Sequence, residues 1–204
     1  MRRVKNLNVN EFRELLLELD TLEFSNQIIS QNDNWYFDRC EEIEDNITYE
    51  IFRETVANHI NLAPEQVALV GSSVYGFSLS PKIEKTFGNF HENSDLDLAI
   101  ISEELFEKVW KELLEAYHRG YGWVMQRHSS EIFRQFALLI SDGKYKTTVL
   151  RDRVKLLDGI SKKIYIRTGS SRPLKYRIYR SRDAVIEYHA SGLRKIKRRL
   201  EDDA

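Results

Sequence analysis

The segment Ser-Asp-Leu-Asp-Leu-Ala-Ile-Ile, residues 94–101, constrains the fold of this chain more than any other part of the sequence. Side chains alternate between the two faces of a strand, so a strand here places Asp95 and Asp97 on one face and the leucines on the other. Neighbouring carboxylates repel one another unless a cation lies between them or water screens them. The segment therefore predicts a strand with one buried apolar face. Its other face carries either a cation site or an exposed acidic strand end.

A second apolar segment, residues 66–70, ends at Gly71-Ser72. The pattern predicts a short buried strand followed by a helix over residues 72–79, and backbone N–H groups at such a helix start can bind phosphate. A Gly-Ser pair and an Asp-x-Asp triplet are each common. Their order here is more specific, because a strand, Gly-Ser, a helix, a loop and an Asp-x-Asp strand follow one another. This order indicates a nucleotide site that combines a phosphate cradle with a divalent metal.

The remaining hydrophobic periodicity predicts strands that alternate with helices. We expect helices at residues 11–19, 38–58, 103–118, 130–140 and 183–200, and strands at residues 66–70, 94–101, 121–127 and 174–180. Residues 26–34 and 80–93 have loop composition, and residues 151–160 are ambiguous. This alternation indicates a mixed α/β or α+β domain. Of these two classes we expect an α+β fold, a small mixed sheet flanked by helices. We expect a single domain over residues 1–204, in which residues 1–60 form an N-terminal helical extension and residues 181–204 a basic C-terminal helix.

Charge is balanced over the whole chain but not along it. Residues 151–204 hold 16 Lys and Arg against 7 Asp and Glu, whereas residues 1–150 hold 15 against 25. This asymmetry either marks a face for an anionic partner or reflects a basic helix packed on an acidic half. The single cysteine, Cys40, excludes an internal disulfide and fits a cytoplasmic setting. No segment approaches the roughly 20 apolar residues of a membrane span, so we expect no membrane association and no secretory signal.

Two motifs give the chain a resemblance to a known superfamily. Gly-Ser-Ser-Val-Tyr-Gly-Phe-Ser at residues 71–78 and Ser-Asp-Leu-Asp-Leu at residues 94–98 resemble the signature of the DNA polymerase β-like nucleotidyltransferases. That superfamily includes poly(A) and CCA-adding polymerases, cyclic-dinucleotide synthases and small antitoxin-type nucleotidyltransferases. The resemblance covers residues 71–101 and implies the nucleotidyltransferase fold.

The resemblance also implies a site and a reaction. Gly71, Ser72 and Ser73 would bind the triphosphate of an NTP, and Asp95 and Asp97 would be catalytic and hold two Mg²⁺ ions. The implied reaction moves a nucleoside monophosphate from the NTP to an acceptor hydroxyl and releases pyrophosphate. The sequence does not identify the acceptor, for which RNA, a nucleotide, a protein hydroxyl and a small drug-like alcohol are all candidates.

The sequence departs from this superfamily at its third carboxylate. Active members usually carry one on a later strand, where it binds a metal and helps to deprotonate the acceptor. The predicted strands at residues 121–127 and 174–180 contain no acid, and the second offers Lys175 and Arg177 instead. Four acids fall on predicted helices or loops: Glu131, Asp142, Asp152 and Asp158. The alternative function is therefore a catalytically reduced protein that binds a nucleotide or RNA as a sensor or regulatory partner.

Several other features are compatible with either a ligand role or an ordinary structural one. Three side chains of the loop lie close in sequence to the phosphate site: Lys82, Lys85 and His91. Tyr188-His189 either faces the nucleotide or forms a packing pair. Trp-Tyr-Phe at residues 35–37 either stacks on a base or covers the core. The basic run at residues 194–199 either contacts RNA phosphates or is solvated helix surface.

Overall fold

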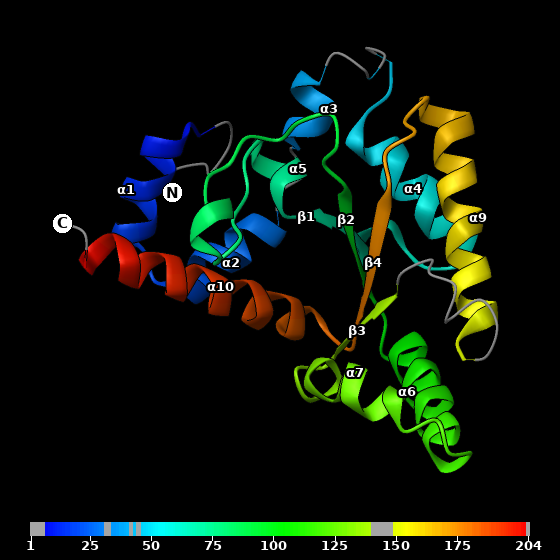
Figure 1. Cartoon of the computed structure of the whole chain (residues 1–204). Coiled ribbons are helices and arrows are strands. Elements are labelled where there is room, and N and C mark those ends of the chain that lie inside the picture. Colours follow the sequence, from blue (N-terminus) through cyan, green and yellow to red (C-terminus); the bar gives the residue numbers. More distant parts are fainter. Residues whose placement is uncertain (1–6, 31–33, 41–42, 44–45, 140–148, 203–204) are drawn as a thin grey trace.

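The computed structural model describes residues 7–30, 34–40, 43, 46–139 and 149–202. Within these residues a four-stranded sheet forms the middle layer, and helices cover both of its faces (Figure 1). This architecture confirms the expected α+β class with a small mixed sheet flanked by helices. Among the helices of the described ranges, none combines the length and the apolar character needed to cross a bilayer.

The sheet has the strand order β1-β2-β4-β3. Its strands are β1 (Val67–Val70), β2 (Leu96–Ile101), β3 (Phe136–Leu139) and β4 (Leu174–Tyr179). β1 and β2 are antiparallel, β2 and β4 are parallel, and β3 and β4 are antiparallel. The parallel pair is decisive for the site, because it places the Asp-x-Asp strand beside a strand that follows it by more than 70 residues.

One face of the sheet packs on the larger of two hydrophobic cores. The helices on this side are α3 (Trp35–Arg39), α4 (Tyr49–Ile60), α6 (Glu103–His118), α7 (Trp123–Phe133) and α9 (Arg151–Thr168). Leu96, Leu98 and Ile100 of β2 point into this core and are fully buried. The strand alternation predicted for β2 therefore holds from Leu96 onward, and Asp97 faces the other side of the sheet. Asp95 lies one residue before the strand and lines the same cleft as Asp97.

The opposite face packs on a second core. The helices on this side are α1 (Val9–Glu18), α2 (Thr21–Ile29), α5 (Ser72–Tyr75) and α10 (Arg182–Asp202). In Figure 1, α1, α2 and α10 lie together on one side of the sheet, with α4 and α9 on the other. Phe12 of α1 contacts the rings of Phe24, Tyr75 and Phe77 at centroid distances of 5.0, 5.2 and 5.4 Å. The N-terminal helices are thus part of a core.

Most predicted elements agree with the structure. The strands predicted at residues 66–70, 94–101 and 174–180 are present, as are the helices predicted at 11–19, 103–118 and 183–200. The ambiguous segment 151–160 belongs to α9. Two short 3₁₀ turns also occur, η1 (Pro64–Gln66) and η2 (Ile83–Lys85), the second within the predicted loop 80–93.

Three other predicted elements have different limits. The helix expected at residues 38–58 begins only at Tyr49, where the Thr48 side chain accepts the N–H of Ile51 and caps the helix. The loop expected at residues 26–34 begins later, because α2 continues to Ile29. The helix expected at 72–79 ends at Tyr75, because Gly76 adopts a left-handed conformation.

The predicted strand 121–127 and the predicted helix 130–140 are wrong. Residues 123–133 form α7, in which Val124, His128 and Glu131 share the buried face at helical spacing. The apolar alternation around Trp123 is too short to separate a strand from a helix. Gln135 then takes a positive φ of 58° and turns the chain into β3. β3 is a strand because β4 pairs with it, which is a contact that local periodicity does not report.

Candidate functional site

The sheet brings the two sequence motifs together. Val70 pairs with Asp97 across the antiparallel β1–β2 ladder, so Gly71 at the end of β1 lies beside that carboxylate. A Cβ atom placed on Gly71 would lie 3.0 Å from Asp97 Oδ2. Gly71 has φ +79° and ψ −148°, a conformation that is essentially restricted to glycine. The glycine is therefore required both by the backbone and by the close approach to Asp97.

The two serines after Gly71 have different surroundings. Ser72 lines a cleft on the α10 side of the sheet. Ser73 is fully buried, and its hydroxyl donates to the Val70 carbonyl at 3.4 Å. Of the predicted nucleotide-binding residues, Gly71 and Ser72 thus lie at the cleft, whereas Ser73 stabilises the turn behind them.

Each aspartate is paired with a cation from β4. Asp97 is the register partner of Lys175 in the parallel β2–β4 ladder, so alternate residues of β4 share the face of the aspartates. Lys175 forms an ion pair with Asp95, and Arg177 Nη1 donates to Asp97 Oδ1 at 2.5 Å. The Arg177 side chain is only 16% exposed. On β4, the later strand beside the aspartates, two basic side chains and no acid therefore face Asp95 and Asp97.

Arg177 is held in place on two sides. Its guanidinium carbon lies 5.8 Å from the centre of the Tyr188 ring, in addition to the bond with Asp97. Burial by itself would lower the pKa of Arg177, but Asp97 together with Tyr179 and Tyr188 outweighs that effect, and the pKa lies above its ordinary value. The guanidinium is a fixed positive charge in the floor of the cleft.

The cleft has a volume of about 400 Å³ and is enclosed by several elements. β2 and β4 form its floor, α5 and the loop 80–93 form one wall, and α10 contributes the other. Seven charged side chains line it: Asp95, Asp97, Lys85, Arg134, Lys175, Arg177 and Lys195. Five of these are basic and two acidic, so the cleft has a surplus of three positive charges and is suited to an anionic ligand.

The sequence identified this site in part. Asp95, Asp97, Gly71 and Ser72 come from motifs, and Lys85 comes from its position in the loop. Arg134 and Lys195 were missed as site residues, because neither belongs to a motif. Lys195 lies in the basic run, whose charge was the only sequence signal that pointed to it. His91 and Lys82 are outside the residues that line the cleft.

Three of the four candidate acids lie away from the aspartate pair. Glu131 of α7 is buried; its Oε2 lies 2.9 Å from His128 Nδ1 and accepts the N–H of Leu138 at 3.1 Å. Asp152 and Asp158 belong to α9, on the opposite side of the sheet. Asp142 is outside the described residues.

The donor set is compatible with one magnesium ion better than with two. Mg²⁺ is commonly held by one or two carboxylates together with substrate phosphates, and Asp95 and Asp97 provide such a pair. Within the described ranges, no group of three or more His, Cys, Asp or Glu side chains is arranged to hold a metal. A magnesium ion at the pair would also compete with Lys175 and Arg177 for the carboxylate oxygens.

The aromatic segment at residues 35–37 has structural contacts. Trp35 packs directly over Gly76, where an added Cβ would meet its indole at 2.6 Å. Tyr36 is fully buried, and its hydroxyl is 2.6 Å from Ser170 Oγ. Phe37 contacts the rings of Tyr49 and Phe52. These aromatic residues belong to the core and not to the cleft.

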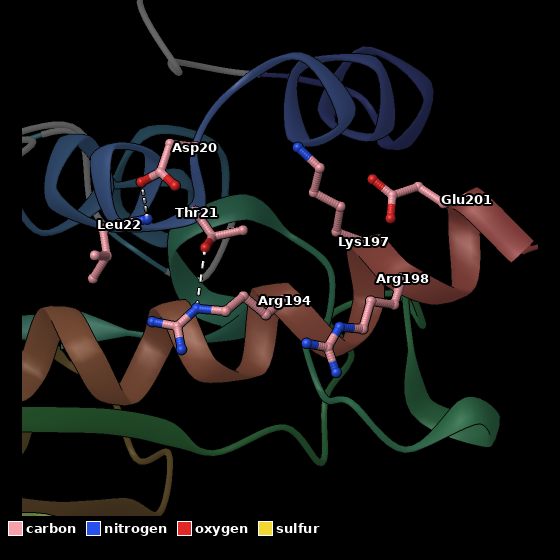
Figure 2. A pocket seen from close by; sticks show the side chains of 7 residues that line it. All are labelled: Asp20, Thr21, Leu22, Arg194, Lys197, Arg198 and Glu201. Carbon is pink, nitrogen blue, oxygen red and sulfur yellow. Dashed lines mark hydrogen bonds between the residues drawn. The ribbon is translucent and has the colours of Figure 1, made fainter.

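Much of the basic run 194–199 is also engaged within the protein. Lys197 Nζ donates to the carbonyls of Leu17 and Leu19 at 2.8 and 2.9 Å, at the C-terminal end of α1. Figure 2 shows Lys197 extending from α10 toward the N-terminal helices, across a cavity of about 350 Å³. Arg194 Nε donates to Thr21 Oγ1 at 3.3 Å, and Arg199 donates to Thr86 Oγ1 at 3.0 Å.

Comparisons of this chain with protein-family models, with curated proteins and with solved structures find no match. The functional proposal below is therefore supported by the geometry of the cleft and by the two motifs that lead to it.

Proposed function

We propose that the cleft binds a nucleoside triphosphate, and that the protein is a catalytically reduced relative of the nucleotidyltransferases. The single observation that supports this proposal is the pairing of Lys175 and Arg177 with Asp95 and Asp97 beside Gly71-Ser72. In this proposal the two basic side chains supply the positive charge that metal ions supply in the active enzymes. Nucleotide binding would regulate the protein or a partner, as in a sensor.

The charges in the cleft are suited to a triphosphate. Charge-assisted hydrogen bonds from Lys and Arg to phosphate oxygens are among the strongest polar contacts in proteins. Five basic side chains surround the cleft, and Arg177 is already oriented by Asp97 and Tyr188. Ser72, Ser78 and Ser80 add hydroxyl donors on the wall that is opposite α10.

The same ion pairs disfavour two-metal transfer. A two-metal reaction requires ligands for both ions, and the register position beside Asp97 carries a lysine. Metal binding would have to displace Lys175 from Asp95 and Arg177 from Asp97. Without a second metal, the acceptor hydroxyl would lose its main source of activation.

Metal-dependent nucleotidyl transfer is the second candidate function, and one observation favours it. Asp97 of β2 lies beside Gly71, and Asp95, one residue before the strand, lines the same cleft, as the resemblance to active nucleotidyltransferases implies. In this candidate, Mg²⁺ at the pair would neutralise the phosphates, and the chain would position an RNA or protein hydroxyl for attack.

Nucleotide binding with and without metal tests the proposal. We expect ATP, GTP, CTP or UTP to raise the melting temperature and to bind by calorimetry in EDTA, with no pyrophosphate released when Mg²⁺ is added. Pyrophosphate release together with a labelled product from an α-³²P NTP would establish the second candidate instead. An absence of NTP binding in both EDTA and Mg²⁺ would refute both.

Asp95→Asn separates the two candidates by the sign of its effect. If Lys175 and Arg177 bind the phosphates, removing one carboxylate reduces repulsion and releases Lys175, so NTP affinity in EDTA rises by about three- to tenfold. If Mg²⁺ bridges the carboxylates and the phosphates, the same change weakens Mg²⁺-dependent binding. Asp152→Asn is the matched control, because it removes an exposed acid from α9 on the other side of the sheet.

A further inference from the structure

His189 of α10 lines the cleft and contains a buried nitrogen without a hydrogen-bond partner. The residue lines the cleft beside Tyr188, whose ring it meets edge-on at a centroid distance of 5.2 Å. Its Nε2 atom is buried and has no hydrogen-bond partner within the described part of the chain. Tyr75, on the α5 side of the same cleft, likewise has a buried hydroxyl without a partner. Buried polar groups without partners are rare and costly, so each calls for an explanation.

The His189 ring differs in charge from the basic and acidic side chains that line the cleft with it. Burial, together with the nearby charge of Arg177, lowers the pKa of His189 to about 3, so the ring is neutral at physiological pH. A neutral imidazole has one donor nitrogen and one acceptor nitrogen and adds no charge. In the proposed function, the five basic side chains of the cleft bind the phosphates. A neutral group is better matched to a hydroxyl or to a base edge.

The cleft also has an apolar part that is suited to a nucleoside. Seven apolar or aromatic side chains line it in addition to the charged ones: Ile28, Val70, Tyr75, Leu79, Pro81, Tyr188 and Leu193. Small-molecule sites typically combine such an apolar lining with a few polar groups that fix orientation. His189 comes from the same helix as Leu193, which lies about one turn further along, and as Lys195, and all three line the cleft.

We infer that His189 binds the nucleoside part of the nucleotide, through a ribose hydroxyl or a polar atom of the base, and so determines which nucleotide the cleft prefers. This assignment rests on the proposed function, because it requires a nucleotide in the cleft. His189 is a specificity-determining residue in this assignment, and the basic side chains hold the phosphates whatever nucleoside is attached.

The test compares ligands that contain a nucleoside with one that does not. ATP, GTP, CTP, UTP, 2′-deoxy-ATP and inorganic tripolyphosphate are titrated into the wild-type protein and into His189→Leu and His189→Gln. For the preferred NTP, His189→Leu should weaken binding roughly three- to tenfold, the loss of one neutral hydrogen bond. Tripolyphosphate affinity should not change. His189→Gln should keep NTP affinity within about twofold, because its amide reaches the Nε2 position.

Two further readouts separate a ligand role from a packing role. Removing a buried unsatisfied nitrogen should raise the melting temperature of the free His189→Leu protein while NTP affinity falls. His118→Leu, an exposed histidine of α6, is the control and should change neither quantity. The 2′-deoxy nucleotide shows whether the contact is to the ribose, and the base series shows whether it is to the base.

The outcomes distinguish this inference from the proposed function. Equal weakening of NTP and tripolyphosphate by His189→Leu would assign His189 to the phosphates and overturn the inference. Unchanged NTP affinity would overturn it as well. If the wild type binds tripolyphosphate, and binds none of the NTPs more tightly than tripolyphosphate, the nucleoside subsite is refuted. The cleft is then a site for anions only. If it binds neither, the proposed function fails. If His189→Leu does not fold, greater weakening by His189→Asn than by His189→Gln supports the contact, and equal affinities refute it.

Discussion

Asp97 is the residue at which distant parts of the chain meet. Its carboxylate lies against Gly71 from the end of β1 and accepts a hydrogen bond from Arg177 of β4. These neighbours impose different requirements, because Gly71 must lack a side chain and Arg177 must supply a charge. Substitutions at these positions therefore test the geometry and the electrostatics of the cleft separately.

Replacing Gly71 tests the geometry. Gly71→Ala forces a side chain into a glycine-only conformation and places a Cβ within 3.0 Å of Asp97 Oδ2. We expect the free energy of unfolding to fall by about 1–3 kcal/mol and NTP binding to weaken. Urea denaturation and calorimetry measure the two effects. Gly122→Ala is the control, because Gly122 has an ordinary helical φ and no atom within 4 Å of its added Cβ. An unaffected Gly71→Ala would contradict the close approach.

Replacing Lys175 tests the electrostatics. Lys175→Asp restores a third carboxylate at the register partner of Asp97 and removes one cation. We expect NTP binding in EDTA to fall at least about tenfold, and Mn²⁺ or Mg²⁺ binding to appear or strengthen, because three acids now converge. Calorimetry and Mn²⁺ electron paramagnetic resonance measure these changes. Lys175→Met should lose metal-free NTP binding without gaining metal. Equal metal affinity in the wild type and Lys175→Asp would contradict the proposal that Lys175 takes the place of a metal ion at the aspartates.

At the scale of elements, α10 contributes side chains to the cleft and also contacts the N-terminal helices. One side of this helix contributes Tyr188, His189 and Lys195 to the cleft. Elsewhere along it, Lys197 donates to carbonyls at the end of α1, a helix whose last turn has no basic residue of its own. The basic character of α10 therefore caps α1 outside the cleft, and in the proposed function it also attracts the anionic ligand at the cleft.

Removing the cap should loosen the contact between α1 and α10. Lys197→Met keeps most of the aliphatic side chain but leaves the Leu17 and Leu19 carbonyls without their donor. We expect a loss of about 1 kcal/mol in unfolding free energy, which corresponds to roughly 2–4 °C in melting temperature for a chain of this size. Calorimetric melting measures the change. Arg198→Met, which removes a neighbouring charge on the same helix, should have less effect; equal losses would argue against the cap.

The elements also show where local sequence is insufficient. β2 was predicted correctly because its alternation is regular and one of its faces is fully buried. α7 and β3 were misassigned because residues 121–140 contain short apolar stretches without a clear period. The limits of these elements depend on the positive φ of Gln135 and on pairing with β4. Such non-local pairing outweighs intrinsic preference over short segments.

At the scale of the whole molecule, the two cores make the N-terminal helices part of the site's support. Phe12 of α1 is fully buried and contacts Phe24, Tyr75, Phe77 and Phe87, which belong to α2, α5 and the segment that follows it. The wall of the cleft that contains Ser72 and Lys85 therefore rests on a helix that begins more than 60 residues earlier in the sequence.

Truncating Phe12 should affect both stability and the cleft. Phe12→Ala removes the ring at the centre of this cluster, and we expect about 3–5 kcal/mol of lost unfolding free energy. NTP binding should also weaken, because α5 and the loop lose their support. Chemical denaturation and calorimetry at low temperature measure both. Phe133→Ala, where the ring is 89% exposed, should change neither. Reduced stability with unchanged NTP affinity would show that the wall is rigid without Phe12.

The sequence by itself determined the local parts of this protein: the two strands, Gly71-Ser72 between them, and the shared face of Asp95 and Asp97. These follow from short-range rules, because backbone alternation decides which side chains share a face and glycine alone accepts the Gly71 conformation. Only the tertiary structure decided that β4 lies parallel to β2 and that α10 covers the same face. The burial of two separate cores sets those placements, and they bring Lys175, Arg177 and His189 to the aspartates across more than 70 residues of chain.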